Sequence, residues 1–116
     1  MINVGNKRVY LACGATDMRK SIDGLSAMVE YSFELDLFDD VLFVFCNRGR
    51  DRLKILEWDG DGFWLHFKRL EKGRFPWPRR EGQNTMELRP EEFQQLLSGT
   101  KLIRKIKSQE IFRAAI

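Results

Sequence analysis

Apolar residues are spaced along the chain in patterns that predict the elements of one folded domain. Residues 8–13 form a short apolar block that ends at Gly14 and favours a buried strand. An apolar residue then recurs every three or four positions, at Met18, Ile22, Leu25, Val29 and Phe33. This spacing is the apolar stripe of an amphipathic helix. We expect the helix to begin at Thr16 or Asp17, whose side-chain oxygens favour an N-cap, and to run to about Leu35.

Three strands are predicted in the middle of the chain. Residues 41–46 are continuously apolar, as in a central strand that is covered on both faces. Residues 52–58 and 63–70 read as two further strands, joined by a type II′ turn with Gly60 and Asp61 at its centre. The hairpin pairs Trp58 with Phe63, Leu56 with Leu65, Lys54 with Phe67, and Arg52 with Arg69. One face is then apolar near the turn and basic at the open end.

The last third of the chain contains an extended segment, a short strand and a helix. The prolines in Phe75–Pro78 force an extended backbone. Residues 85–89 favour an edge strand. Pro90 suits the first turn of a helix that ends at Gly99 and turns Phe93, Leu96 and Leu97 to the core.

These elements predict a single α+β domain over residues 1–100. We expect a mainly antiparallel sheet of four or five strands, one long N-terminal helix over 17–35, and a shorter C-terminal helix over 90–99. Residues 101–116 carry apolar residues among several lysines and arginines. They are interpreted as a basic amphipathic C-terminal helix or tail.

Composition agrees with a small globular domain. The chain has 116 residues, of which 43% are hydrophobic and 32% are charged, which argues against intrinsic disorder. No stretch reaches the roughly 18 to 20 apolar residues of a membrane span, and the N-terminus has no apolar signal region. We therefore expect a cytoplasmic protein that does not contact a membrane. Cys13 and Cys46 lie in apolar surroundings and favour reduced core thiols over a disulfide.

Positive charge is concentrated in one part of the chain. The net charge is +3, but residues 47–80 carry ten cations and five acids, a local charge of +5, which leaves −2 for the rest. A local excess of this kind favours a face that binds a polyanion. The alternative is a solvated charged face whose cations pair with acids such as Glu57 or Glu71.

The basic hairpin is the best candidate for binding DNA, because a two-stranded ribbon fits the major groove. The candidate phosphate contacts are Arg48, Arg50, Arg52, Lys54, Lys68, Arg69, Lys72 and Arg74. Most aromatic residues among them are expected in the core of so small a domain. Trp77, between two prolines, is the one expected to be exposed. Phe75 and Trp77 are therefore candidates for docking on another protein.

Neither the acids nor the single histidine favours catalysis. Asp17 lies at a helix start, and Asp59 and Asp61 lie in a hairpin turn, where aspartate serves local hydrogen bonding. His66 has no second histidine, CxxC or HExxH motif with which to bind a metal. We expect no catalytic residue, metal, cofactor or small-molecule substrate. Asp17, Arg19 and Lys20 are a further candidate contact for a partner protein.

Three ordered stretches resemble a known family. They are Thr16–Leu25, then Leu42–Phe45 with Asn47–Arg48, and then Asp51–Leu56 through Trp58–Phe63 to Lys68–Glu71 and Phe75–Pro78. Together they resemble the TnpB accessory protein, the second-open-reading-frame product of IS-sixty-six-type insertion sequences. This is not the longer RNA-guided nuclease of the same name. The resemblance implies a mobile-element protein that supports DNA transposition and recombination beside a separate transposase, and it supplies no biochemical activity.

Charge and resemblance together predict a non-catalytic accessory protein that binds DNA and assists the transposase of the same element. Such a protein is cytoplasmic, and associated with the nucleoid when bound to DNA. The alternative is an adaptor that recruits the transposase without touching DNA, through Phe75–Pro78 and the tail at 101–116. The DNA sequence and the oligomeric state are left open.

Overall fold

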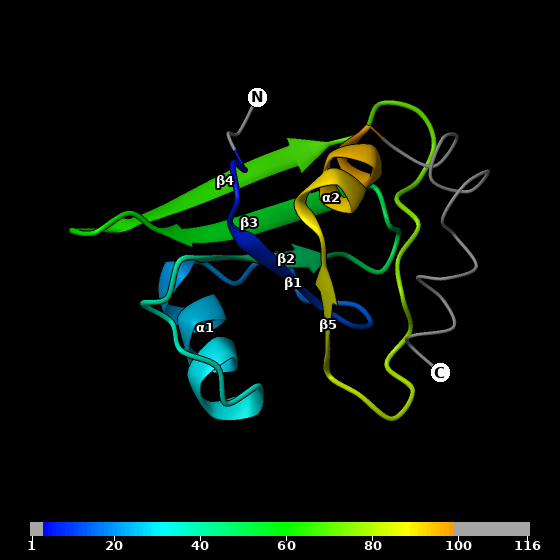
Figure 1. The fold of residues 1–116 in the computed structure, drawn as a ribbon. Coiled ribbons are helices and arrows are strands. Elements are labelled where there is room, and N and C mark those ends of the chain that lie inside the picture. Colours follow the sequence, from blue (N-terminus) through cyan, green and yellow to red (C-terminus); the bar gives the residue numbers. More distant parts are fainter. Residues whose placement is uncertain (1–3, 99–116) are drawn as a thin grey trace.

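A five-stranded sheet forms the centre of the computed structural model, which describes residues 4–98 (Figure 1). The strand order is β4-β3-β2-β1-β5. The strands are β1 (Arg8–Ala12), β2 (Val41–Cys46), β3 (Arg52–Trp58), β4 (Phe63–Arg69) and β5 (Thr85–Leu88). Every residue of β2 is buried, which confirms the prediction of a central strand. The predicted edge strand is β5.

The sheet is mixed, whereas a mainly antiparallel sheet was expected. Three pairings are antiparallel, but β1 pairs with β2 in parallel, with Arg8 opposite Val41 and Leu11 opposite Val44. Two parallel neighbours need a crossover from the end of one to the start of the next. The helical segment between them provides this crossover.

This helical segment is shorter than predicted. It consists of α1 (Ile22–Ala27) and one turn of π-helix, η1 (Met28–Ser32). It therefore begins five residues after Asp17, and Ser21 occupies the N-cap position without a side-chain bond. The Asp17 carboxylate instead accepts a hydrogen bond from the Arg19 amide at 2.9 Å and closes a local turn. Aspartate side chains offer such turns as an alternative to the helix.

The helix also ends early. The amide of Phe33 donates to the carbonyl of Met28 at 2.9 Å, a π-type bond, and Glu34 adopts a left-handed backbone with φ 56°. The apolar stripe is nevertheless used as predicted, because Leu25 and Val29 are fully buried and Met18, Ile22 and Phe33 pack around them. The periodicity thus predicted the buried side chains correctly and the helix boundaries incorrectly.

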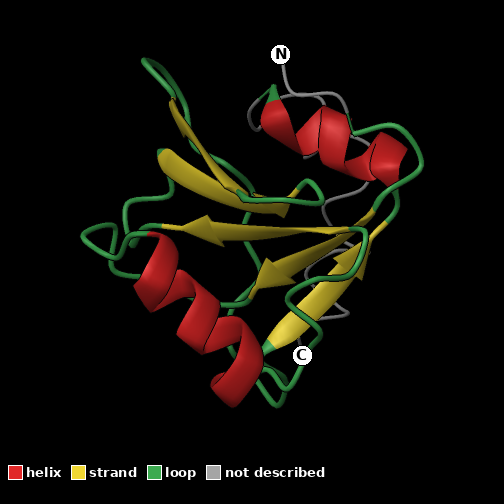
Figure 2. Cartoon of the chain, turned by 90° about the vertical axis from the view of Figure 1, so that its left-hand side faces the viewer, coloured by secondary structure: helices red, strands yellow, loops and turns green. Residues whose placement is uncertain are grey.

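The two helices cover opposite faces of the sheet (Figure 2). The core on one face contains Leu25 and Val29 with Phe43 and Phe45 of β2. The other face is covered by α2 (Pro90–Leu97), whose buried residues are Phe93, Leu96 and Leu97, as predicted. The expected end of this helix at Gly99 and the tail at 101–116 lie outside the described residues.

The hairpin has the predicted register. Trp58 lies opposite Phe63 and Arg52 opposite Arg69, with the pairs between them also as expected. In the turn, the Asp59 amide donates to the carbonyl of Gly62 at 3.0 Å, and Gly60 has φ 105°. This positive angle at the first central residue agrees with a type II′ turn.

The expected exposure of Trp77 is wrong. The segment Phe75–Pro78 is buried throughout, with Phe75 at 0% and Trp77 at 5% exposure. The indole nitrogen of Trp77 donates to the carbonyl of Ala12 at 2.9 Å. An extended segment with two aromatic residues can cover the end of a small core, and here it packs on its own domain. Neither side chain is therefore available to dock on another protein.

Both cysteines are free and fully buried, as expected for core thiols. Burial raises the pKa of the Cys46 thiol to about 12, so this group stays protonated and unreactive at neutral pH. None of the described helices is long and apolar enough to cross a membrane.

Replacing Phe75 by alanine should lower the free energy of unfolding by about 3–5 kcal/mol, because the change removes a fully buried aromatic ring and leaves a cavity. Urea unfolding followed by circular dichroism measures this loss. Tyr31→Ala is the matched control: its ring is 81% exposed, so the change should stay within about 0.5 kcal/mol. Equal losses in the two variants would contradict the burial of Phe75–Pro78.

Candidate nucleic-acid interface

Three loops that are distant in the sequence meet at one end of the sheet. Because β1 and β2 are parallel, the segments 14–20 and 47–51 both begin at this end, where the Thr16 amide donates to the Cys46 carbonyl at 2.8 Å. The segment that follows β4 joins them through two bonds, from the Leu70 amide to the Asp51 carbonyl at 2.8 Å and from the Phe75 amide to the Arg50 carbonyl at 2.7 Å. The backbone thus fixes the three loops relative to one another.

This end of the sheet is strongly basic. We define the basic end as the segments 14–20, 47–52 and 69–81. It carries ten cations, Arg19, Lys20, Arg48, Arg50, Arg52, Arg69, Lys72, Arg74, Arg79 and Arg80. Four acids accompany them, Asp17, Asp51, Glu71 and Glu81, so the formal charge is +6.

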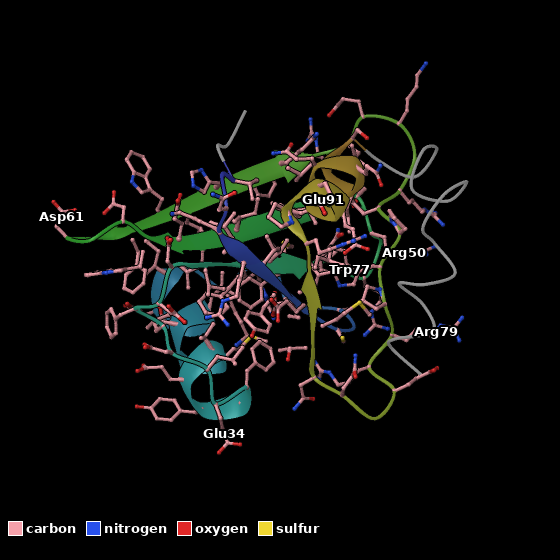
Figure 3. The ribbon with its side chains drawn as sticks, viewed as in Figure 1. Glu34, Arg50, Asp61, Trp77, Arg79 and Glu91 are labelled. Carbon is pink, nitrogen blue, oxygen red and sulfur yellow. The ribbon has the colours of Figure 1, made fainter. Side chains whose placement is uncertain are left out.

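The opposite end of the sheet is acidic. We define the acidic end as the segments 5–8, 36–40 and 57–62, which carry six acids and two cations, a formal charge of −4. Figure 3 labels Asp61 at this end and Arg50 and Arg79 at the other. Both cations of the acidic end are neutralised locally, since Lys7 pairs with Glu57 and Asp40, and Arg8 pairs with Asp39.

The loop between β2 and β3 holds its arginines in a defined geometry. The side-chain oxygen of Asn47 accepts bonds from the amides of Asp51 and Arg52, both at 3.0 Å, and its nitrogen donates to the Asp51 carboxylate at 2.7 Å. That last bond is the main reason why the pKa of Asp51 lies below its usual value. Arg50 adopts a left-handed backbone with φ 61°. The loop therefore presents Arg48 and Arg50 from a rigid turn.

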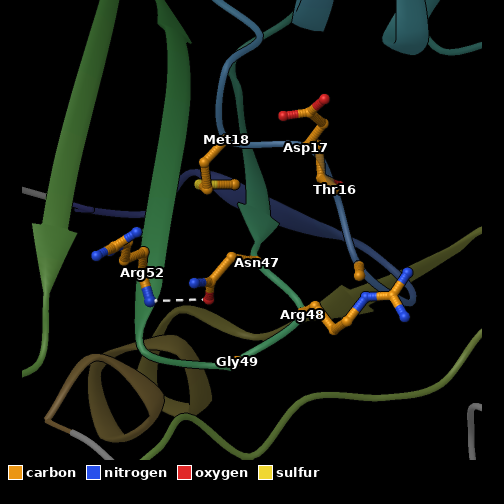
Figure 4. A pocket seen from close by; sticks show the side chains of 8 residues that line it. Thr16, Asp17, Met18, Asn47, Arg48, Gly49 and Arg52 are labelled. Atoms are coloured by element: carbon orange, nitrogen blue, oxygen red, sulfur yellow. Dashed lines mark hydrogen bonds between the residues drawn. The ribbon is translucent and has the colours of Figure 1, made fainter.

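A cleft of about 430 Å³ opens between this loop and the segment before α1 (Figure 4). It is lined by Ala15, Thr16, Asp17, Met18, Asn47, Arg48, Gly49 and Arg52. Among the described residues, no carboxylate forms an ion pair with Arg48 or Arg52. The charges of these two lining residues are therefore not neutralised by a described carboxylate.

The only acid in this lining is Asp17, and it is already neutralised. Its carboxylate accepts bonds from the Arg19 side chain at 2.7–3.1 Å. These bonds, together with the bond from the Arg19 amide, lower the pKa of Asp17 to about 2. Asp17, Arg19 and Lys20, which were predicted to contact a partner protein, lie on the rim of the basic end and not at a helix start.

The eight cations predicted to bind DNA do not share one face. Arg52, Lys54 and Arg69 lie on the α1 side of the hairpin, whereas Lys68, opposite the core residue Leu53, lies on the α2 side. The Lys68 amine donates to the carbonyl of Leu97 at the end of α2. Side chains alternate between the faces of a strand, so neighbours in sequence cannot form one surface.

Two further predicted cations have partners within the domain. The Lys54 amine donates to the carbonyls of Met18 and Lys20, both at 2.8 Å, and so holds the segment before α1 against the sheet. Arg69 pairs with Glu71 at 2.9 Å. The remaining candidates, Arg48, Arg50, Arg52, Lys72 and Arg74, are exposed, and none forms an ion pair with a described acid.

Arg79, Arg80 and Asn47 were not among the sequence-predicted site residues. Both arginines contribute to the excess charge of residues 47–80, but the hairpin interpretation did not use them. The backbone bond from the Gly14 amide to the Pro78 carbonyl at 2.8 Å brings them to the basic end. The role of Asn47 in shaping the loop depends on its position directly after a central strand, which is the available sequence signal.

His66 is a partly buried histidine of β4. Its Nε2 lies 2.9 Å from a carboxylate oxygen of Glu57, which also pairs with Lys7. Among residues 4–98, no group of three or more histidine, cysteine or acidic side chains is placed to hold a metal ion.

The stretches that carry the family resemblance converge on the cleft, since they supply all of its lining residues except Ala15 and Gly49. A family model described as IS66 Orf2 like protein matches residues 7–107. The chain belongs to the IS66 Orf2-like family. It therefore has an accessory role in the transposition of an insertion sequence.

Two relatives from Sinorhizobium fredii (strain NBRC 101917 / NGR234) are similar over most of their length. The chain is 42% identical over 94 residues to the protein named "Uncharacterized protein y4hO", which is 81% of both chains. It is 35% identical over 92 residues to "Uncharacterized protein y4jC", which is 79% of this chain and 78% of that one. No solved structure matches the chain.

Lys54→Met should lower the free energy of unfolding by about 1–3 kcal/mol, because the change leaves two carbonyls without a charged donor. Arg52→Met, two residues earlier on the same strand, removes an exposed cation and should cost less than about 0.5 kcal/mol. Urea unfolding of both variants measures the difference. If Arg52→Met cost as much as Lys54→Met, the structural role of the Lys54 amine would be contradicted.

Glu57 should make the stability of the fold depend on pH. Burial alone would raise the pKa of its carboxyl, but bonds from Lys7 and His66 outweigh burial and hold the pKa below its usual value. The carboxylate therefore stabilises the fold above its unfolded pKa of about 4.3, and this contribution is lost as pH falls through the lower folded pKa. In Glu57→Gln, unfolding measured from neutral to acidic pH should show lower stability at neutral pH and a smaller loss in acid. If the dependence of stability on pH were the same in Glu57→Gln as in the native protein, the Glu57 carboxylate would not be a source of that dependence.

Proposed function

We propose that the protein assists transposition by binding DNA at its basic end, without catalysing a reaction itself. The observation that supports this most is the charge of +6 on three loops fixed to one another by backbone bonds. Cations held in fixed register lose little conformational entropy when they meet phosphates. The surface proposed here is the basic end as a whole, not the two-stranded ribbon that the sequence suggested.

The cleft is the proposed centre of this surface. Arg48 and Arg52 flank it, and Asn47 and the backbone around Gly49 add polar groups. Arginine forms paired hydrogen bonds with phosphate oxygens, which suits a backbone contact more than a base contact. We therefore propose that DNA lies across the basic end with a backbone phosphate in the cleft, while Arg50, Lys72 and Arg74 contact its neighbours.

The second proposed partner is the transposase of the same element, bound at a surface other than the basic end. The protein would then act in the cytoplasm, associated with the nucleoid while bound to DNA.

Fluorescence anisotropy with a labelled duplex, at several salt concentrations, tests the proposal. Four to six phosphate contacts predict a slope of log affinity against log salt of about −4 to −5. Arg48→Ala and Arg52→Ala should each reduce the slope by about 1 and weaken binding roughly tenfold at 0.1 M salt. The affinities for the element's terminal inverted repeat and for a scrambled duplex are compared to measure sequence preference.

Arg8→Ala is the matched control, because Arg8 is an exposed arginine at the acidic end and pairs with Asp39. It should leave both affinity and slope unchanged. Absence of binding at low salt would overturn the proposal and favour an adaptor that recruits the transposase alone. Equal losses of DNA affinity in the Arg8 and Arg48 variants would indicate that binding depends on the overall charge of the protein and not on a defined surface.

A further inference from the structure

Within residues 4–98, no strand pairs with the outer edge of β4, which is seven residues long, whereas β5 at the other side of the sheet has four. The side chains of β4 include two large exposed aromatics, since Trp64 and Phe67 are each 57% exposed. Long edges with exposed aromatic residues are templates for pairing with another strand.

The turn determines which backbone groups of β4 point outward. The bond from the Asp59 amide to the Gly62 carbonyl makes this pair a hydrogen-bonded one. Hydrogen-bonded pairs alternate along an antiparallel ladder, so Trp64, His66 and Lys68 direct their backbone groups to β3. The outward groups belong to Phe63, Leu65, Phe67 and Arg69.

We propose that β4 pairs with β4 of a second copy of this chain, antiparallel, about a two-fold axis at His66. This is the only centre that overlaps all seven residues. This axis sets Phe63 opposite Arg69 of the second copy and Leu65 opposite its Phe67. The backbone groups that point outward from one β4 strand therefore meet those that point outward from the other. The two sheets become one continuous sheet through main-chain hydrogen bonds.

Charge complementarity selects this occupant and this direction. The turn residues 59–62 carry two acids and no lysine or arginine, a charge of −2, and residues 68–74 carry four cations and one acid, a charge of +3. Antiparallel pairing sets the acidic turn of each copy beside the +3 segment of the other copy, twice in one dimer. Parallel pairing would set like charges together. The edge of β4 is distinct from the cleft, but Lys72 and Arg74 belong both to the proposed DNA surface and to this basic segment. Arg48 and Asp61 each belong to one surface alone, so variants of these two residues test the two proposals separately.

A cysteine at the axis tests the register. His66→Cys places two thiols in a non-hydrogen-bonded pair, where side chains directly opposite lie about 4.5–5.5 Å apart, and mild oxidation should produce a disulfide-linked dimer. Trp64→Cys is the matched control, because its thiols would lie four residues apart along the strands, about 13 Å, and should not link. The native cysteines are 0% exposed and do not interfere.

Sedimentation equilibrium of the nuclease-treated protein gives a second measurement. The mass should rise with concentration toward twice the 13.7 kDa of one chain. Asp61→Lys should weaken the dimer about tenfold, because the acidic turn then has no net charge to place beside the basic segment of the other copy. Lys72→Glu, which lowers that basic segment from +3 to +1, should weaken the dimer as well. Tyr31→Lys, on the exposed side of η1, should have no effect.

A monomer at all concentrations would overturn the inference, as would a dimer that Asp61→Lys leaves unchanged. Equal disulfide linkage in the Trp64→Cys and His66→Cys variants would also overturn it, because the register would then be undefined. If dimers were found only without nuclease treatment, DNA would be bridging the two copies, and pairing through β4 would be contradicted. The anisotropy measurement distinguishes these failures from a failure of DNA binding, because it responds to Arg48 and not to Asp61.

Discussion

The parallel pairing of β1 with β2 is the constraint on which the rest of the structure depends. Parallel strands end at the same edge of a sheet, so the chain leaves both strands at one end and must return across a face through α1 and η1. The segments that begin at Gly14 and Asn47 therefore meet, although 33 positions separate them in the sequence. The basic end and its cleft are the direct result.

Burial of the sheet on both faces explains where the polar groups lie. Every residue of β2 is buried, so polar contacts concentrate at the strand ends and along the outer strand. The chain also uses some of its cations to hold the fold. Lys54 and Lys68 bind carbonyl groups of the segments beside α1 and α2. Arg48, Arg50, Arg52 and Arg74 are exposed and form no ion pair with a described acid, so they are the candidates for contact with a polyanion.

Local hydrophobic and turn patterns in the sequence predicted much of this fold, but they could not predict contacts between distant segments. The register of the hairpin follows from one Gly-Asp turn, and the burial of β2 follows from six apolar residues in a row. The parallel pairing could not be predicted, because no local pattern records which distant strand is the neighbour. Trp77 was misplaced for the same reason, since its partner, the Ala12 carbonyl, lies 65 positions away.

For the candidate site, the sequence indicated the sign of the charge and most of the residues. It did not indicate their arrangement. Because side chains alternate along β4, Lys68 lies on the α2 side of the sheet, where it binds a carbonyl. Arg69 forms an ion pair with Glu71, two residues away. Asp17 misled the helix prediction because its side chain satisfies the Arg19 amide within a turn. Such competition between local bonds is decided by the packing that follows, which a linear pattern does not contain.

The separation of a +6 end from a −4 end across one small sheet gives the described part of the chain, residues 4–98, a permanent electric dipole moment along its strands. In the field of a polyanion, a dipole experiences a torque as well as an attraction. The protein would therefore rotate before contact, and a larger fraction of diffusional encounters would begin with Arg48 and Arg52 foremost. The charge distribution thus acts on the association rate at distances up to roughly a Debye length, about 10 Å at 0.1 M salt, before any hydrogen bond has formed.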